Sequence, residues 1–142
     1  MEQNESKTDV SSEEIEDILE NYKTVAVVGL SPKEDSPSYK VASYLQSKGF
    51  RVIPISPLGQ DILVEKVYPR LLEVPFEIDI VDIFRKPEAV LEIVKEAIEK
   101  RAKVEWMQEG VINNEAAELA RKAGIRVVMD RCIKKDHQKL FG

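Results

Sequence analysis

The stretch TVAVVGLSPKEDSPSYKVASYL, residues 24–45, decides the fold of this chain. Its opening segment, residues 24–29, is apolar at successive positions, which is typical of a parallel strand buried on both faces. Ser36 and Pro37 then provide a helix N-cap and a first-turn proline. A strand, a polar loop and a helix start in this order favour phosphate binding, because the free N–H groups and the dipole of a helix N-terminus attract anions.

The alternation of strand and helix continues along the chain. The pattern predicts further strands at residues 50–56, 66–68, 78–84, 103–107 and 125–130, and further helices at 12–22, from Pro87 onward and at 113–123. We therefore expect an α/β fold: a single doubly wound Rossmann-like domain with a mainly parallel sheet, in the strand order 3-2-1-4-5-6. Residues 1–10 lack apolar periodicity and are expected to form a flexible N-terminal tail before the domain at 11–142.

Composition narrows the class of protein. The chain has 142 residues, of which 43% are hydrophobic, and this suits one domain with one core. A net charge of −5 and the lack of a basic stripe argue against nucleic-acid binding. The single cysteine, the polar start and the absence of a long apolar run lead us to expect a cytoplasmic protein without a membrane segment. The helix faces leave room for a homodimer, although no residue specifies one.

The place of the ligand follows from the predicted fold. In such a sheet a ligand lies beyond the carboxyl ends of the strands, at the point where the strand order reverses. The segments predicted to meet there are residues 29–31, 54–57, 84–86 and 107–110. Basic residues in or near these segments are candidate counter-charges for a phosphate, namely Lys33, Lys40 and Arg85.

The glycine pattern of a dinucleotide site is incomplete in this sequence. Gly29 is present, but Ser31 and Glu34 occupy the two later glycine positions of G-x-G-x-x-G. The second predicted strand ends in ISP, residues 55–57, without the acidic residue that would bind a free ribose. The sequence therefore lacks the two features that specifically indicate an adenine dinucleotide. It remains compatible with a ligand that contains an ADP moiety with a phosphorylated ribose.

Seven short stretches occur in an order that resembles the small stand-alone CoA-binding proteins, relatives of the CoA-binding domain of the succinyl-CoA synthetase α subunit. They are VGLSP with SYKVASYL, VIPISP, VYPRL, DIVDIFR, WMQEGV and VVMDRCIK, and the resemblance covers about residues 20–136. It implies a Rossmann-like fold that binds coenzyme A. The pyrophosphate would lie against the first loop, and the adenine near the segment after the second strand.

The resemblance also implies which residues contact coenzyme A or an acyl-CoA. The matching segments are the first loop, its helix entry, the loop after the second strand and the ends of the fourth and fifth strands. With Lys33 added as a candidate counter-charge, the expected cofactor-binding residues are Gly29, Leu30, Ser31, Pro32, Lys33, Ser38, Tyr39, Lys40, Ile55, Ser56, Pro57, Phe84, Arg85, Met107, Gln108 and Glu109. No catalytic and no metal-binding residue is expected.

Two departures from the family pattern limit the expected function. Relatives often place a lysine or arginine directly after the Ser-Pro, where it meets the 3′-phosphate, whereas this chain has Leu58. The 3′-phosphate would then have to be bound by Lys33, Lys40 or Arg85. The synthetase carries its phosphorylated histidine in a further domain, and this chain ends soon after the last predicted strand. We therefore expect CoA binding without catalysis by this chain alone.

Two alternatives stay open. One is a CoA-linked redox or acyl-transfer component that uses Cys132 or a partner subunit, although free cysteines are more often buried and inert. The other is a sensor of an adenine dinucleotide. His137 is predicted to be a surface or terminal-helix residue rather than a base. Asp79 and Asp82 are predicted to face opposite sides of a strand, which excludes joint chelation of a metal.

Overall fold

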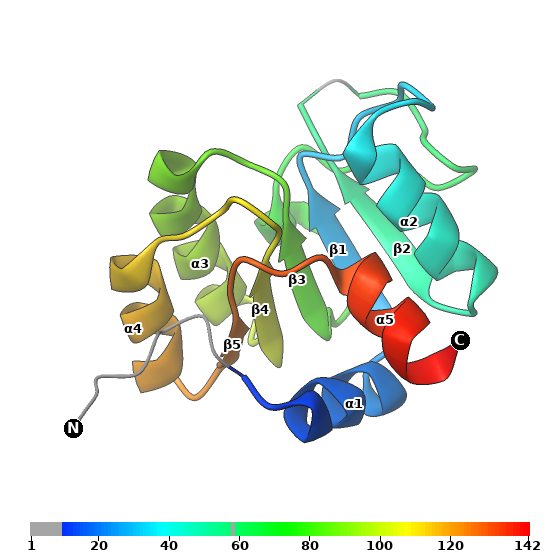
Figure 1. Ribbon diagram of the computed structural model, residues 1–142. Helices are drawn as coiled ribbons and strands as arrows, with labels where there is room; N and C mark the ends of the chain where they lie inside the picture. Colours follow the sequence, from blue (N-terminus) through cyan, green and yellow to red (C-terminus); the bar gives the residue numbers. More distant parts are fainter. Residues whose placement is uncertain (1–9, 58) are drawn as a thin grey trace.

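The computed structural model describes residues 10–57 and 59–142, and within them five parallel strands form one sheet in the order β2-β1-β3-β4-β5 (Figure 1). The strands are β1 Thr24–Val28, β2 Arg51–Ile55, β3 Ile80–Ile83, β4 Val104–Met107 and β5 Arg126–Val128. The helices are α1 Ser12–Asn21, α2 Pro37–Ser47, α3 Val90–Glu99, α4 Asn114–Lys122 and α5 Ile133–Phe141, with short 3-10 turns η1 Leu71–Glu73 and η2 Pro87–Ala89. This architecture confirms the predicted Rossmann-like α/β class. None of these helices is long and apolar enough to cross a membrane.

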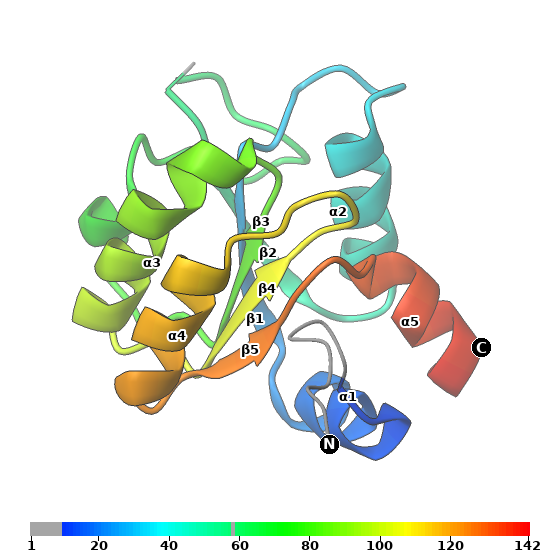
Figure 2. The same ribbon diagram turned by 60° about the vertical axis from the view of Figure 1, so that its left-hand side comes forward.

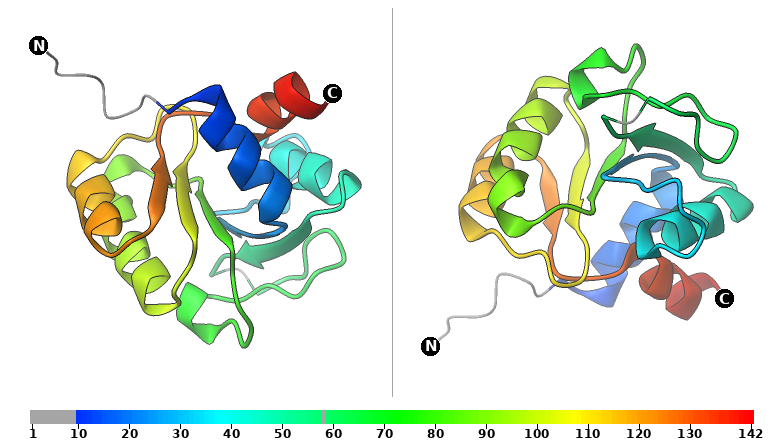
Figure 3. Two further views of the ribbon diagram at one scale, coloured as in Figure 1. Left: turned by 90° about the horizontal axis from the view of Figure 1, so that it is seen from below. Right: turned by 90° about the horizontal axis from the view of Figure 1, so that it is seen from above.

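Helices cover both faces of the sheet (Figures 2 and 3). One face is covered by α1, α2 and α5, where Leu19, Leu45 and Ile133 share a buried cluster, and the other by α3 and α4, with Val94 and Ala120. From β1 the chain steps to β2 in one direction, and from β3 it steps to β4 and β5 in the other. Because such crossovers are right-handed, the connecting helices fall on opposite faces. The switch point therefore lies between the carboxyl ends of β1 and β3.

The segment predicted as the third strand does not form a strand. Tyr68 makes a single parallel bridge to Ile55, through 3.0 Å hydrogen bonds from Tyr68 N to Pro54 O and from Ser56 N to Tyr68 O. Extending this ladder toward Lys66 would require an N–H group on Pro54, and proline has none. Five of the six expected strands therefore form in the described residues. These five lie in the predicted order.

The polar segment after the last strand forms helix α5, which packs against α1 and α2. Its inner face includes two polar side chains, Asp136 and His137, both less than a tenth exposed. Asp136 accepts two 2.8 Å hydrogen bonds from the Arg131 guanidinium, and His137 Nδ1 lies 2.7 Å from the Tyr44 hydroxyl. The sequence predicted that His137 lies either on the surface or in a terminal helix. It lies in the terminal helix, on the side that is buried.

Two carboxyl groups are buried inside the protein, one on each face of the sheet. Asp82 lies opposite Trp106 and faces α1, α2 and α5, whereas Glu105 lies opposite Val81 and faces α3 and α4. Both side chains are fully buried, and no carboxyl oxygen of either has a hydrogen-bond partner among the described residues. Burial raises the pKa of Asp82 well above its usual value. Burial also raises the pKa of Glu105 to about 8, against the lowering effect of the Arg121 charge.

Candidate functional site

The carboxyl ends of β1, β2 and β3 lie close together around Gly29. Its N–H donates a 2.9 Å hydrogen bond to Ile55 O, and Phe84 N donates one of the same length to Val28 O. Gly29 has φ +89°, and a Cβ at this position would lie 2.4 Å from Phe84 O and 2.9 Å from Arg85 Cδ. Only glycine fits here, because both the backbone conformation and the close approach of the next strand exclude a side chain.

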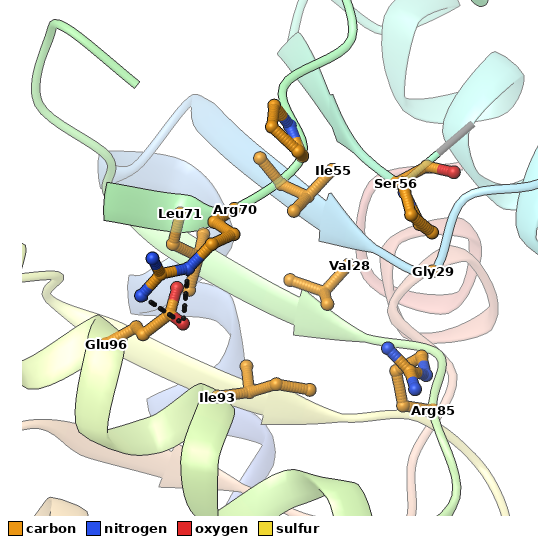
Figure 4. Close-up of a pocket in the computed structure, with 11 residues that line it drawn as sticks. Val28, Gly29, Ile55, Ser56, Arg70, Leu71, Arg85, Ile93 and Glu96 are labelled. Carbon is orange, nitrogen blue, oxygen red and sulfur yellow. Dashed lines mark hydrogen bonds and ion pairs between the residues drawn. The ribbon is translucent and has the colours of Figure 1, made fainter. Parts of the chain in front are cut away.

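Two adjoining cavities, of about 180 and 310 Å³, meet at Gly29, Ser56, Pro57 and Arg85, and we call them together the β1 cleft. The smaller one extends from the ends of β1 and β2 to η1 and α3 (Figure 4). The larger one lies over the first loop, residues 30–32. The cleft thus occupies the switch point at which a ligand of this fold class binds.

The smaller cavity has an apolar floor between two arginines. Ile55 and Ile93 lie on the floor (Figure 4). At one end, Arg70 donates hydrogen bonds of 3.3 and 3.2 Å from Nε and Nη2 to Glu96 Oε2. At the other end lies Arg85, whose exposed side chain makes no hydrogen bond or ion pair with another described residue. The cavity therefore offers a free guanidinium to an anionic ligand.

The serines of the first loop mainly shape the loop itself. Ser31 N donates to Ser38 Oγ (3.0 Å), Lys33 N to Ser31 Oγ (3.1 Å), and Tyr39 N to Ser36 Oγ (3.2 Å). The last bond is the predicted N-cap of α2. Each of these hydroxyls already accepts a backbone hydrogen bond. Accepting such a bond leaves the O–H group of a serine able to donate, so phosphate contacts can come from these hydroxyls as well as from backbone N–H groups, such as that of Ser38 at the start of α2.

A second cavity, of about 650 Å³, lies between the start of α2, the ends of β3 and β4, and α5; we call it the α2–α5 pocket. Gln108 lines it although its side chain is only 4% exposed, and its Oε1 accepts a 3.0 Å hydrogen bond from Ile133 N. Cys132, the residue before α5, also lines the pocket and is 8% exposed. The pocket therefore combines buried polar and thiol groups with an opening at the carboxyl edge.

The structure gathers most of the predicted cofactor residues around these cavities. The β1 cleft contains Gly29, Leu30, Ser31, Pro32, Ile55, Ser56, Pro57 and Arg85, and the α2–α5 pocket contains Lys40, Phe84, Gln108 and Glu109. Tyr39 lines a shallower hollow along α2, and Ser38 is buried beneath the first loop. Lys33 lines none of these cavities, and Met107 is fully buried in the core on the α3 and α4 side. Leu58 lies outside the described residues.

Several residues that line the cavities were not predicted as site residues. In the β1 cleft these are Pro69, Arg70, Leu71, Ile93 and Glu96, and in the α2–α5 pocket Pro37, Val41, Lys134, Lys135 and Gln138. Cys132, which also lines this pocket, was named from the sequence only for the redox alternative. Arg70 was within a stretch that the sequence singled out, VYPRL, but nothing in one sequence relates it to Glu96 on α3. The α5 residues were missed because α5 was not recognised as a packed helix.

The described residues contain no group of three or more His, Cys, Asp or Glu side chains placed to hold a metal ion. Asp79 Oδ2 instead accepts long hydrogen bonds of 3.3 Å from Lys23 N and Thr24 N. It therefore supports the entry to β1, whereas Asp82 lies inside the protein.

The strand order, with its reversal at β1 and cavities along the carboxyl edge, defines a ligand-binding α/β protein of the Rossmann-like class. The chain belongs to the CoA-binding domain family, whose sequence model matches residues 23–138. The similarity suggested by the seven sequence stretches is thereby confirmed.

Three relatives illustrate the range of the family. The chain is 39% identical over 127 residues to the uncharacterized protein YneT of Bacillus subtilis, covering 89% of this chain and 94% of that protein. It is 31% identical over 117 residues to the ADP-forming acetate–CoA ligase II of Archaeoglobus fulgidus, covering 74% of this chain but only 17% of the ligase. The solved structure of a hypothetical protein from Pyrococcus horikoshii matches with a TM-score of 0.93 at 39% identity, over 100% of both chains.

Proposed function

We propose that this protein binds coenzyme A or an acyl-CoA along the carboxyl edge of the sheet and performs no catalysis of its own. The observation that carries the proposal is the β1 cleft, a partly apolar cavity at the switch point beside Arg85, whose guanidinium has no partner among the described residues. Membership of the CoA-binding domain family supports the choice of ligand. The similarity to part of an ADP-forming acetate–CoA ligase agrees with this choice.

Each part of coenzyme A has a matching place along this edge. The flat, apolar face of adenine suits the floor formed by Ile55 and Ile93. The diphosphate suits the loop at residues 30–32 and the N-terminus of α2, where the helix dipole and backbone N–H groups favour an anion. The pantetheine arm would then cross the end of β3 toward the α2–α5 pocket.

Arg85 is the best of the three candidate partners for the 3′-phosphate. Its side chain lines both cavities of the β1 cleft, whereas Lys33 lines neither and Lys40 lies in the α2–α5 pocket. A guanidinium can also donate two parallel hydrogen bonds to one phosphate. In this arrangement Arg85 supplies the cation that the family pattern would place after Ser56 and Pro57.

Titration calorimetry of the purified protein tests this proposal. The wild type is expected to bind CoA more tightly than dephospho-CoA and to show no measurable affinity for NADH. Arg85→Ala is expected to weaken CoA binding about tenfold or more, the cost of one charge-assisted contact, and to affect dephospho-CoA much less.

Lys103→Ala is the matched control, because it removes an exposed cation just before β4, at the opposite edge of the sheet. Equal affinities of the wild type for CoA and dephospho-CoA would refute the 3′-phosphate contact. High affinity for NADH would favour the dinucleotide sensor instead.

A redox role is a second candidate because Cys132 lines the α2–α5 pocket. Its thiolate would attack CoA disulfide, form a mixed disulfide with one CoA and release the other as a thiolate. Mass spectrometry after incubation with CoA disulfide tests this role. A CoA adduct on the wild type that is absent from Cys132→Ser would support it, and an unmodified wild type would remove it.

A further inference from the structure

The α2–α5 pocket and the β1 cleft lie on opposite sides of one short segment. Phe84 lines the pocket, and the next residue, Arg85, lines the cleft. Both cavities open at the carboxyl edge of the parallel sheet. A ligand whose nucleotide occupies the cleft can therefore reach the pocket only with its other end, which in a CoA thioester is the acyl group.

We propose that the α2–α5 pocket binds the acyl group of an acyl-CoA and selects a short acyl chain that ends in a carboxylate. This inference rests on the proposed function, because it requires CoA in the β1 cleft. It adds the class of ligand: a thioester of a short dicarboxylic acid, rather than free CoA or a purely apolar acyl-CoA.

The buried amide of Gln108 provides a contact for the thioester carbonyl. Its Oε1 accepts the hydrogen bond from Ile133 N, and this bond fixes which way the amide points. Its Nε2 then donates no hydrogen bond to another described residue, although the side chain is 4% exposed and lines the pocket. Among the described residues, only the carboxyl oxygens of Asp82 and Glu105 are fully buried without a partner, so Gln108 Nε2 is reachable from the pocket. A ligand carbonyl in the pocket would accept a hydrogen bond from it.

The charge of the pocket favours an anionic end group. Lys135 Nζ donates hydrogen bonds of 3.0 and 3.1 Å to the two carboxylate oxygens of Glu109, so these two charges compensate each other. Lys40 and Lys134 also line the pocket, and neither forms an ion pair with another described residue. Lys134 Nζ only lies over the ring of Tyr44, 5.7 Å from its centroid. Two cations without an ion-pair partner among the described residues thus line this pocket, and both also line the hollow along α2, which Glu34 lines as well.

The size and remaining lining of the pocket set the length of the acyl chain. A volume of about 650 Å³ holds the end of a pantetheine arm and a short chain. Pro37, Val41 and Phe84 provide apolar walls for the methylene groups. An acyl chain with a few methylenes between its carbonyl and its carboxylate therefore matches the walls, the Gln108 amide and the lysines together.

Succinyl-CoA and butyryl-CoA test the inference, because both carry a four-carbon acyl chain and differ in a terminal carboxylate against a methyl group. Calorimetry with the wild type is expected to show succinyl-CoA binding about tenfold more tightly than butyryl-CoA. In the double variant Lys40→Ala, Lys134→Ala this ratio is expected to fall to about one. The ratio within each protein cancels any general loss of CoA affinity. Lys139→Ala, an exposed lysine of α5 outside the pocket, should keep the wild-type ratio.

Gln108→Glu tests the carbonyl contact separately. The carboxylate keeps an oxygen to accept the hydrogen bond from Ile133 N but loses the N–H donor. This variant is expected to weaken butyryl-CoA binding several-fold relative to free CoA. Burial of a carboxyl group is expected to lower its unfolding temperature, and comparing the two ligands within one protein cancels that loss. A role that is only structural would instead change all CoA ligands equally.

The possible failures are distinguishable. If CoA, succinyl-CoA and butyryl-CoA all fail to bind the wild type, the proposed function is wrong. If CoA binds and the wild type does not prefer succinyl-CoA, or the double variant keeps the preference, only the assignment of the acyl pocket is overturned.

Discussion

Replacing Gly29 by alanine is expected to destabilise the protein by about 2 to 5 kcal/mol and to abolish CoA binding. Two costs add: a left-handed backbone carrying a side chain, and a Cβ forced to 2.4 Å from Phe84 O. Relief of the clash would push the first loop away from the end of β3, where the β1 cleft lies. Urea unfolding monitored by circular dichroism measures the stability, and calorimetry measures the binding.

Gly124→Ala is the matched control for this prediction. Gly124 also has a positive φ, +85°, but a Cβ there would meet no atom within 4 Å. Its replacement should cost only the conformational part, about 1 to 2 kcal/mol, and should leave CoA binding unchanged. If the two variants lose the same stability, the close approach of β3 to Gly29 is not what requires the glycine.

Replacing Glu105 by glutamine is expected to change how stability depends on pH. Burial raises the pKa of Glu105 from an ordinary 4.5 to about 8 in the folded protein. Between these values the folded state holds a proton that the unfolded state has released, so wild-type stability falls as the pH rises. One such group removes about 5 kcal/mol across that window, at about 1.4 kcal/mol per pH unit. Glutamine does not ionise, so this part of the slope should disappear.

The free energy of unfolding of wild type and Glu105→Gln, measured in urea at intervals from pH 5 to pH 8.5, tests this prediction. The advantage of the variant should grow by about 3 to 5 kcal/mol toward the alkaline end. Glu99→Gln, an exposed glutamate at the end of α3, should follow the wild-type curve. Parallel curves for wild type and Glu105→Gln would show that Glu105 is already ionised in the fold. Burial raises the pKa of Asp82 too, so part of the slope should persist in the variant.

The sequence predicted most of the scaffold because the signals were local. A run of apolar residues, an N-cap at Ser36 and a glycine after β1 each concern only a few neighbouring residues, and all three were found as expected. The third strand failed for a reason that is not local. Its pairing depended on Pro54, a proline of another strand, and a missing N–H there stopped the ladder after one bridge.

Helix α5 was not predicted to be a packed helix because part of its inner face is polar. Sequence periodicity detects a packed helix by its apolar stripe, yet Asp136 and His137 turn inward here. Each is stabilised by a partner that the sequence does not indicate as such, Arg131 for the first and Tyr44 for the second. A buried polar side chain needs such partners, and only the folded chain supplies them.

The sequence by itself determined the class of fold, the edge of the sheet along which the cavities lie, and the glycine on which the first loop turns. These follow from hydrophobic periodicity and from the order of strands and helices, which are properties of short stretches. Only the tertiary structure decided that Arg85 faces the β1 cleft, that Arg70 meets Glu96 across it, and that α5 closes a second cavity over Gln108. Those outcomes depend on distances between residues far apart in the chain, and such distances exist only once the core has packed.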